Sequence, residues 1–350
     1  MKKLRVLLLV LEELLPPPGA EELDWEETYP YQMELDVQMT LRALGHTVET
    51  VGVGKDLEVI RERQLAFRPD IAFNVITDFH DITSYEAHVV SYLELLKLPY
   101  TGCNPRGITL GNDKSLCKQI LMWHGVPCPA FTSFQPGKKK PRLPKGVEYP
   151  VIVKSAIEHG STGISQASVV KTDKQLEKRV AYMFDRVGGE VIAEQFIEGR
   201  ELTVSIVGNG SRLTVLPVWE VWYSKLPKTK HAICTEQVKW DIDYAQSIGI
   251  KTGPARRLSE KKQKECQAIA KRAYQALGLS GYARMDLRMD ADGTVYVIEA
   301  NVNPDLTEIE DFSEAAQKHG MGYAGLLQLV LESGMKYKAP WKAGPNKKYQ

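Results

Sequence analysis

The chain has 350 residues, a formal net charge of +1 and a composition that is 43% hydrophobic and 25% charged. These values are typical of a globular protein with two or three domains, and so small a net charge provides no general attraction to nucleic acids or membranes. The five cysteines are scattered without a C-x-x-C pair, which argues against a disulfide framework or a zinc site and suits a reducing cytoplasm.

The N-terminal segment predicts a buried strand over residues 4–11. It superficially resembles a signal peptide, but Arg5 interrupts its apolar run, Glu12 and Glu13 follow, and no small-residue cleavage site appears. No apolar run reaches the ~20 residues that are needed to cross a bilayer. We therefore expect a cytoplasmic protein without a membrane or nucleic-acid partner.

Strand and helix patterns alternate up to about residue 110, which indicates an α/β fold with a parallel sheet. Its further strands are expected at 47–53 and 69–76, and its helices at 34–44 and 57–68. The later elements are expected to be a helix capped by Asn112, a strand at 151–154, a helix at 173–186, a strand–turn–strand unit at 190–208, an ordered loop or flap at 219–257, a helix at 260–277 and a hairpin at 281–304.

The hairpin GYARMDLRMDADGTVYVIEANVNP carries the most informative polar pattern. A two-residue turn at Asp292-Gly293 would place Asp286 opposite Glu299 and Arg284 opposite Asn301. Two carboxylates facing each other in a sheet destabilise it unless a cation lies between them. Oxygen ligands of this kind suit Mg²⁺, and Mn²⁺ can take the same ligands. The alternative is a surface hairpin with solvated charges.

Two lysines point to a bound anion. Lys154 ends the strand at 151–154, and the Gly/Ser/Thr-rich segment 160–163 (Gly160, Ser161, Thr162, Gly163) follows, whose backbone N–H groups could cradle phosphate oxygens. Lys114 lies in the first turn of its helix, where the helix dipole disfavours a cation unless an anion is near. The alternatives are a flexible surface hairpin and an exposed lysine.

The segment EQFIEGRE, from Glu194 to Glu201, predicts a strand, a tight turn and a second strand. Backbone groups at such a turn could bind an adenine edge, and a carboxylate beyond it could bind ribose hydroxyls. A solvated turn is the alternative. His80 is interpreted as a surface or internally satisfied histidine on its own pattern.

Taken in order, these segments resemble the ATP-grasp ligases, and within them the D-alanine–D-alanine ligase group. The resemblance covers about residues 78–335 and is carried by SYLELLKLPYTG, NDK, VIVKSAIEHGSTGIS, AEQFIEGRELTV, the hairpin with its EAN ending, and HGMGYAGLLQLVLE. It implies an N-terminal parallel-sheet domain (1–110), two α+β subdomains that clasp ATP (111–205 and 206–335) and a basic, frayed tail (336–350). It also implies a homodimer.

The resemblance implies roles for individual residues. Lys114, Lys154 and the phosphate loop (160–163) would contact ATP phosphates, Glu194 and the backbone near Ile197 the adenine, and Glu201 the ribose. Asp286, Glu299 and Asn301 would bind two Mg²⁺ ions. Arg284 would stabilise the acyl phosphate, Lys239 in the flap would bind a further phosphate, and His80 would lie at the substrate pocket. Asn303, Asp305 and Glu310 would lie on the substrate side.

The departures from the family pattern gather on the substrate side. Gly160 stands where the family's phosphate loop has a serine, and Trp240 where a tyrosine follows the flap lysine. Asp305 replaces a glycine, and Glu310 stands where a serine would grip the carboxylate of the acceptor, which Glu310 would repel. The N-terminal glutamate of the family has only Glu12 and Glu13 as candidate counterparts.

The sequence therefore predicts an ADP-forming carboxylate–amine ligase that joins small molecules, or a peptide, through an acyl phosphate and is not specific for two D-alanines. One alternative is a D-alanine–D-alanine ligase with a rearranged pocket. A second is an ATP-binding regulatory protein without activity, and a third is a Mg²⁺-dependent kinase on the same scaffold.

Overall fold

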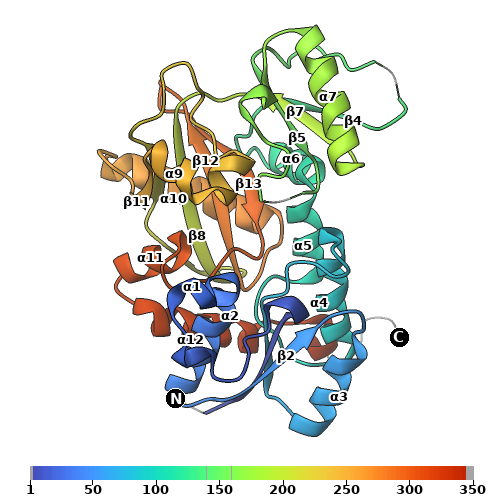
Figure 1. Ribbon diagram of the computed structural model, residues 1–350, viewed down its shortest axis with the longest axis vertical. Helices are drawn as coiled ribbons and strands as arrows, with labels where there is room; N and C mark the ends of the chain where they lie inside the picture. The colour runs from blue at the N-terminus through green and yellow to red at the C-terminus, as the bar shows by residue number, and fades with distance from the viewer. Residues whose placement is uncertain (1–2, 139, 159, 344–350) are drawn as a thin grey trace.

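The computed structural model describes residues 3–138, 140–158 and 160–343 (Figure 1). At its lower end lies a parallel three-stranded sheet of order β2-β1-β3, as the alternating pattern predicts. Its strands are β1 (Arg5–Leu11), β2 (Thr47–Val53) and β3 (Ile71–Asn74). The helices around it are α1 (Trp25–Thr28), α2 (Gln32–Ala43), α3 (Glu58–Phe67) and α4 (Glu86–Leu95).

A four-stranded antiparallel sheet of order β4-β7-β5-β6 forms the upper right of the molecule (Figure 1). Its strands are β4 (Phe131–Phe134), β5 (Val151–Ser155), β6 (Val169–Val170) and β7 (Val191–Gln195). Helix α7 (Asp173–Val187) covers one face by burying Leu176, Val180 and Met183 against the valines of β5 and β7. Helices α5 (Pro105–Asn112) and α6 (Lys114–Trp123) connect it to the lower sheet.

The third sheet is antiparallel, with the strand order β11-β10-β8-β12-β13 and β9 paired to β8. Helix α10 (Glu260–Ala276) packs on β8, β12 and β13. The strands are β8 (Arg200–Asn209), β9 (Arg212–Val215), β10 (Trp219–Tyr223), β11 (Ile250–Pro254), β12 (Tyr282–Met289) and β13 (Val295–Asn301).

The C-terminal helices return to the N-terminal sheet. Helix α11 (Asp311–Lys318) precedes α12 (Gly322–Lys336), which contacts α2 and β3 and shares one apolar core with β1 (Figure 1). Because β8 also contacts α12, this core joins the lower sheet to the hairpin sheet. The metal-candidate hairpin is therefore anchored against the N-terminal part of the chain.

Three expectations from the sequence are corrected. Segment 219–257 is more regular than a loop, because β10 and β11 pair in it and the short helices α8 (Glu236–Trp240) and α9 (Ile242–Ser247) lie between them. Helix α6 is capped by Asp113, whose Oδ1 accepts a hydrogen bond from Leu116 N, rather than by Asn112. The tail is not frayed over 337–343, since Tyr337 packs on Tyr100 and a 3₁₀ turn spans Pro340–Ala343. Residues 344–350 lie outside the described part.

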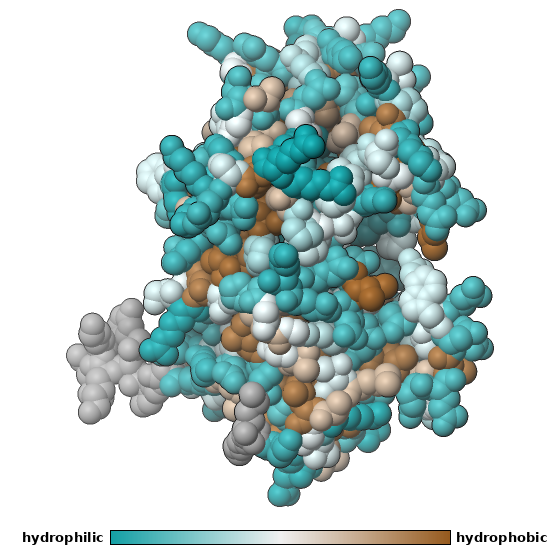
Figure 2. All heavy atoms as spheres, turned by 90° about the vertical axis from the view of Figure 1, so that its left-hand side faces the viewer, coloured by the Kyte–Doolittle hydropathy of each residue, from teal (hydrophilic) through white to brown (hydrophobic). Residues whose placement is uncertain are grey.

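Over the described ranges, none of the helices combines the length and the apolar character that a membrane-spanning segment requires. Figure 2 shows one side of the molecule as mainly hydrophilic, with a hollow toward its right-hand edge at mid-height.

Candidate active site

The hairpin of β12 and β13 brings the predicted pairs together. Asp286 lies opposite Glu299 and Arg284 opposite Asn301, as the sequence predicts. Beyond Asp286 the register shifts by one residue, so that Met289 pairs with Val295. The prediction of a two-residue turn is wrong, because the loop has one residue more. Gly293, within this loop, has a φ of 82°. The bulge beside Asp286 compensates for the longer turn, and the pairing at the site is retained.

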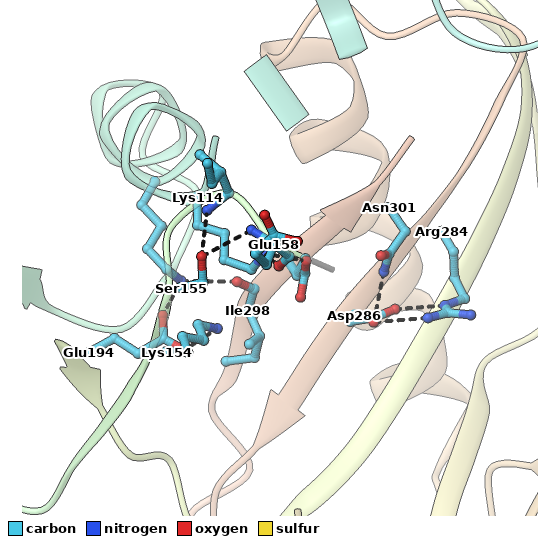
Figure 3. A network of polar contacts seen from close by, with 12 residues as sticks. Lys114, Lys154, Ser155, Glu158, Glu194, Arg284, Asp286, Ile298 and Asn301 are labelled. Carbon is cyan, nitrogen blue, oxygen red and sulfur yellow. Dashed lines mark hydrogen bonds and ion pairs between the residues drawn. The ribbon is translucent and has the colours of Figure 1, made fainter. Parts of the chain in front are cut away.

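Asp286 is held by a cation and an amide. Arg284 donates from Nε to Asp286 Oδ1 over 2.8 Å and from Nη2 to Oδ2 over 3.1 Å, and Asn301 Nδ2 donates to Oδ2 over 2.8 Å (Figure 3). Burial alone would lower the pKa of Arg284, but the Asp286 charge outweighs it and raises the pKa. The guanidinium is therefore fixed and positively charged beside the metal-candidate carboxylate.

A second cluster of charges lies next to the first and comes from four elements (Figure 3). Lys114, at the start of α6, makes an ion pair of 2.9 Å with Glu299 and donates to the carbonyl of Glu158 over 2.7 Å. Glu194, on β7, lies between Lys118 and Lys154, with each Nζ at 2.7 Å from one of its carboxylate oxygens. Three lysines thus share two carboxylates, and this leaves a positive excess that suits an anion.

This lysine cluster is almost completely buried: Lys118 and Glu194 are each 1% exposed. Burial alone would raise the pKa of Glu194, but Lys118 and Lys154 outweigh it and the pKa is lowered. Burial would likewise lower the pKa of Lys154, but Glu194 and Glu299 outweigh it and the pKa is raised. The ammonium and the carboxylate both stay charged at neutral pH.

Two residues of the site were not identified from the sequence. Lys118 also donates to the carbonyl of Ile298 over 3.0 Å, at the bulge of β13. Arg288 lies opposite Glu201 on β8, 3.7 Å from its carboxylate, and its guanidinium stacks over the ring of Phe196. The signals were present, because Lys118 is four residues from Lys114 on one helix face and Arg288 alternates with Asp286 on one strand face.

The phosphate loop is joined to the flap. Ser161 Oγ donates to the carbonyl of Cys234 over 2.9 Å, Gly163 N donates to Glu236 Oε2 over 2.8 Å, and Trp240 Nε1 donates to the Gly160 carbonyl over 3.2 Å. Gly160 has a φ of 67°, and a Cβ there would lie 3.5 Å from the Trp240 ring and 3.9 Å from Lys239 Nζ. The flap thus brings Lys239 to the phosphate loop.

The predicted adenine end is apolar. Ile197 and Phe196 are buried after β7, and Phe196 packs with Val169 and Ile233. Glu201 lies on β8 near Tyr223, whose hydroxyl is 3.4 Å from its carboxylate. Burial raises the pKa of Glu201, and Arg288 opposes this shift. A planar apolar group and a hydroxyl-bearing group could be held side by side here.

The predicted substrate-side residues separate into two groups. Asn303 accepts from the Tyr282 hydroxyl over 2.8 Å and donates to the carbonyl of Ile76 over 2.8 Å. Asp305 and Glu310 are exposed and lie in the segment between β13 and α11. His80 is exposed and its Nε2 bonds to the carbonyl of Lys55 over 3.0 Å, and its place at the substrate pocket stays a prediction.

Two N-terminal carboxylates on α2 lie near this segment: Asp36, whose Oδ2 accepts a hydrogen bond from Glu308 N over 3.0 Å, and Glu34, close enough to Asp305 for their charges to interact. The sequence candidates Glu12 and Glu13 are both exposed. Glu34 was not identified from the sequence because a glutamate inside an amphipathic helix is usually solvated, whereas this one is 2% exposed.

The donor set at the hairpin fits a hard divalent cation. Within the described residues, no group of three or more His, Cys, Asp or Glu is arranged to hold a metal ion, so the protein offers two carboxylates and one amide. Mg²⁺ commonly takes few protein ligands and completes its shell with water and phosphate oxygens. In this structure Arg284 makes an ion pair with Asp286, and Lys114 makes one with Glu299.

Comparisons with known proteins agree with this geometry. A family model described as the D-Ala–D-Ala ligase C-terminus matches residues 120–332. The D-alanine–D-alanine ligase of Bordetella petrii is 30% identical over 310 residues, which cover 88% of this chain and 90% of the relative. That of Bordetella avium is 31% identical over 252 residues, 72% of this chain and 75% of the relative.

Solved structures share the fold. The D-alanine–D-alanine ligase of Bacillus anthracis in complex with ATP superposes with a TM-score of 0.72 at 20% identity, over 95% of this chain and 98% of that chain. The Coxiella burnetii ligase gives a TM-score of 0.68 at 20% identity, over 96% of this chain and 94% of that chain. The architecture is therefore the ATP-grasp fold of these ligases.

Proposed function

Because the chain belongs to the D-alanine–D-alanine ligase family, we propose that it is an ATP- and Mg²⁺-dependent carboxylate–amine ligase whose substrates are not two D-alanines. Membership of the family makes it an ADP-forming ligase that uses ATP. The observation that carries the proposal is Glu310, a carboxylate where the family pattern has a serine that grips the acceptor's carboxylate. Repulsion between the two carboxylates would weaken D-alanine as an acceptor.

We propose that ATP lies between the phosphate loop and the hairpin. Lys114, Lys154 and Lys239 would contact its phosphates, the backbone near Ile197 its adenine and Glu201 its ribose. The contacts of Glu194 refine its proposed role: its carboxylate is engaged by Lys118 and Lys154, so it would orient these ammonium groups while its strand backbone lines the adenine site.

We propose that Asp286, Glu299 and Asn301 hold Mg²⁺. The bound ion would neutralise phosphate oxygens. When it binds, the Arg284 guanidinium that now holds Asp286 would be free to turn toward the substrate, and Lys114 could exchange Glu299 for a phosphate oxygen. With this exchange, Arg284 and Lys114 would each have a negatively charged partner both before and after the ion and ATP bind.

The chemistry that this arrangement supports has two steps. A substrate carboxylate oxygen attacks the γ-phosphorus of ATP, the bond to the β-phosphate oxygen breaks, and an acyl phosphate and ADP form. An amine then attacks the acyl carbon, loses a proton and expels phosphate to give an amide. Arg284 and the lysines would stabilise the negative charge that develops in both steps, and the flap would exclude water.

We further propose a cytoplasmic homodimer built from units at 1–110, 111–205 and 206–335. Because β8 begins at Arg200 and belongs wholly to the hairpin sheet, the second boundary is better drawn before that residue. We also propose, from the family resemblance, that His80 lies at the substrate pocket.

A second candidate function is D-alanine–D-alanine ligation itself, which the relatives from Bordetella favour. Trapping with hydroxylamine tests the ligase chemistry first. With Mg²⁺·ATP and amino acids offered one at a time, including D-alanine, at least one should yield a hydroxamate together with ADP. Hydroxamate absent with every amino acid, in a protein that binds Mg²⁺·ATP by calorimetry, would contradict ligase activity on amino acids.

A further inference from the structure

Carboxylates gather where α2 meets the segment between β13 and α11, beyond the ATP end of the site. This acidic cluster consists of Glu34 and Asp36 on α2, Asp305, Glu308 and Glu310 in the segment, and Asp311 at the start of α11. Two contacts fix the segment on α2: Glu308 N donates to Asp36 Oδ2 over 3.0 Å, and Leu306 N to Met33 Sδ over 3.4 Å. The carboxylates are thus spread along a junction between elements that lie far apart in the sequence.

The acidic cluster has few counter-charges. Over the described ranges, none of its members makes an ion pair with a lysine, arginine or histidine. Glu310 keeps part of its surface in solvent, but the burial of its carboxyl, followed by the charges of Asp305 and Asp311, raises its pKa to about 7, and Arg284 and Lys239 oppose this shift. Glu310 therefore lies within electrostatic reach of both cations of the proposed reaction centre.

One buried polar group near the acidic cluster has no hydrogen-bond partner among the described residues: the hydroxyl of Tyr323 on α12. Glu34, a member of the cluster, is 2% exposed; burial raises the pKa of its carboxyl, a hydrogen bond to its own backbone opposes the shift, and the charges of Asp305 and Asp36 add to it. The Tyr323 pKa responds to carboxylates of the same cluster: burial, followed by the charges of Asp36, Glu308 and Asp305, raises it. A buried hydroxyl without a partner is costly unless a ligand satisfies it.

The spacing of the acidic cluster argues for an organic cation. Within the described ranges, no three acidic residues of the cluster converge to hold a metal ion, whereas an extended ligand could meet carboxylates that are spread along a junction. We propose that the amine acceptor is a diamine: one amino group attacks the acyl phosphate near Arg284, and the second, as an ammonium, is held by Glu310, Asp305 and Glu34. This inference rests on the proposed function and names its acceptor class.

The experiment compares 1,3-diaminopropane with propylamine, which has the same chain but lacks the second ammonium. The donor is the amino acid that gives most hydroxamate, and hydroxylamine serves as a small acceptor without a second charge. We expect kcat/KM for the diamine to exceed that for propylamine roughly 10-fold or more, as for other charge-assisted contacts. This preference should fall as ionic strength rises.

Variants locate the effect. Glu310→Gln and Glu34→Gln should each raise KM for the diamine relative to KM for hydroxylamine, whereas Glu260→Gln, an exposed carboxylate on α10, should not. Equal use of propylamine and diamine, or no effect of either variant, would overturn the diamine proposal while hydroxamate formation still supports the ligase. Loss of hydroxamate with every donor would overturn both.

Discussion

Trp240 Nε1 donates a hydrogen bond of 3.2 Å to the backbone carbonyl of Gly160, and this bond joins the flap to the phosphate loop. Both residues depart from the family pattern, and they fit each other. A Cβ at Gly160 would make ordinary van der Waals contact with the Trp240 ring at 3.5 Å, but the φ of 67° lies in the left-handed region that favours glycine. A serine at position 160 would therefore strain the backbone that accepts this hydrogen bond.

Replacing Trp240 with phenylalanine should loosen the closed flap. The loss of one neutral hydrogen bond is worth about 1 kcal/mol, so the ratio of closed to open flap should fall roughly fivefold. Water would then reach the acyl phosphate more often, and the ADP formed per amide should rise above one. Trp123→Phe, at an 87% exposed position on α6, is the control. An unchanged ratio of ADP to amide in Trp240→Phe would show that this hydrogen bond does not hold the flap closed.

Asp286 and Asp292 lie on the same hairpin and should behave differently. Asp286→Asn removes a proposed metal ligand and should lower kcat by roughly 100-fold while raising the Mg²⁺ concentration needed for half-maximal rate. Asp292→Asn makes the same chemical change at an exposed turn residue and should change neither value. Initial rates of ADP release over a Mg²⁺ titration measure both. Equal effects of the two substitutions would rule out a metal role for Asp286.

Glu194 should be essential for the stability of the lysine cluster. Glu194→Gln would leave Lys118 and Lys154 buried without their carboxylate, and breaking a buried ion pair in this way typically costs about 3–5 kcal/mol. Urea denaturation should show this loss in the free energy of unfolding, whereas Glu198→Gln, an exposed neighbour, should stay within about 0.5 kcal/mol of the parent. Comparable stability of the two variants would show that the lysines do not depend on Glu194.

Glu86 should make the protein less stable as pH rises. Burial raises the pKa of Glu86 to about 8, with Asn112 Nδ2 donating to one carboxylate oxygen over 2.7 Å. Between the unfolded pKa near 4.5 and a pH of about 8, the folded state binds the extra proton, so stability falls with pH over this window.

Glu86→Gln removes this titration. The decrease in the free energy of unfolding between pH 5.5 and 8.5 should therefore be smaller for the variant than for the parent. The two decreases should differ by roughly a few kcal/mol. Chemical denaturation at the two pH values, with both proteins in the same buffers, measures the difference. Parallel losses of stability in parent and variant would mean that Glu86 is charged throughout.

The hairpin illustrates what the sequence can and cannot determine. Side-chain alternation along β12 and β13 is a local pattern, and it correctly paired Asp286 with Glu299. The bulge beside Asp286 depends on distant groups, since Ile298 accepts from Lys118 on α6 and Val297 N donates to the carbonyl of Pro127. A local pattern carries no information about such contacts.

The charged residues of the site also differ in whether a local sequence pattern or only a distant contact reveals them. Lys114, Lys154 and Glu299 stand out because each has an unusual local setting, a helix start, a strand end or a facing carboxylate. Lys118 and Glu34 occupy ordinary helical positions, and only packing against other elements buries them. The place of His80 at the substrate pocket was assigned by resemblance and stays a prediction; in the structure its Nε2 lies 3.0 Å from the carbonyl oxygen of Lys55.

We propose that the ATP end of the family site is retained while the acceptor side has changed. ADP release with Mg²⁺·ATP tests this directly, measured first with D-alanine alone and then with pairs of carboxylate donors and amines, with mass spectrometry of the products. We expect an amide formed in step with ADP from a pair other than two D-alanines, and little ADP with D-alanine alone. Steady ADP release with D-alanine alone, at a rate that matches D-alanyl-D-alanine formation, would contradict this proposal.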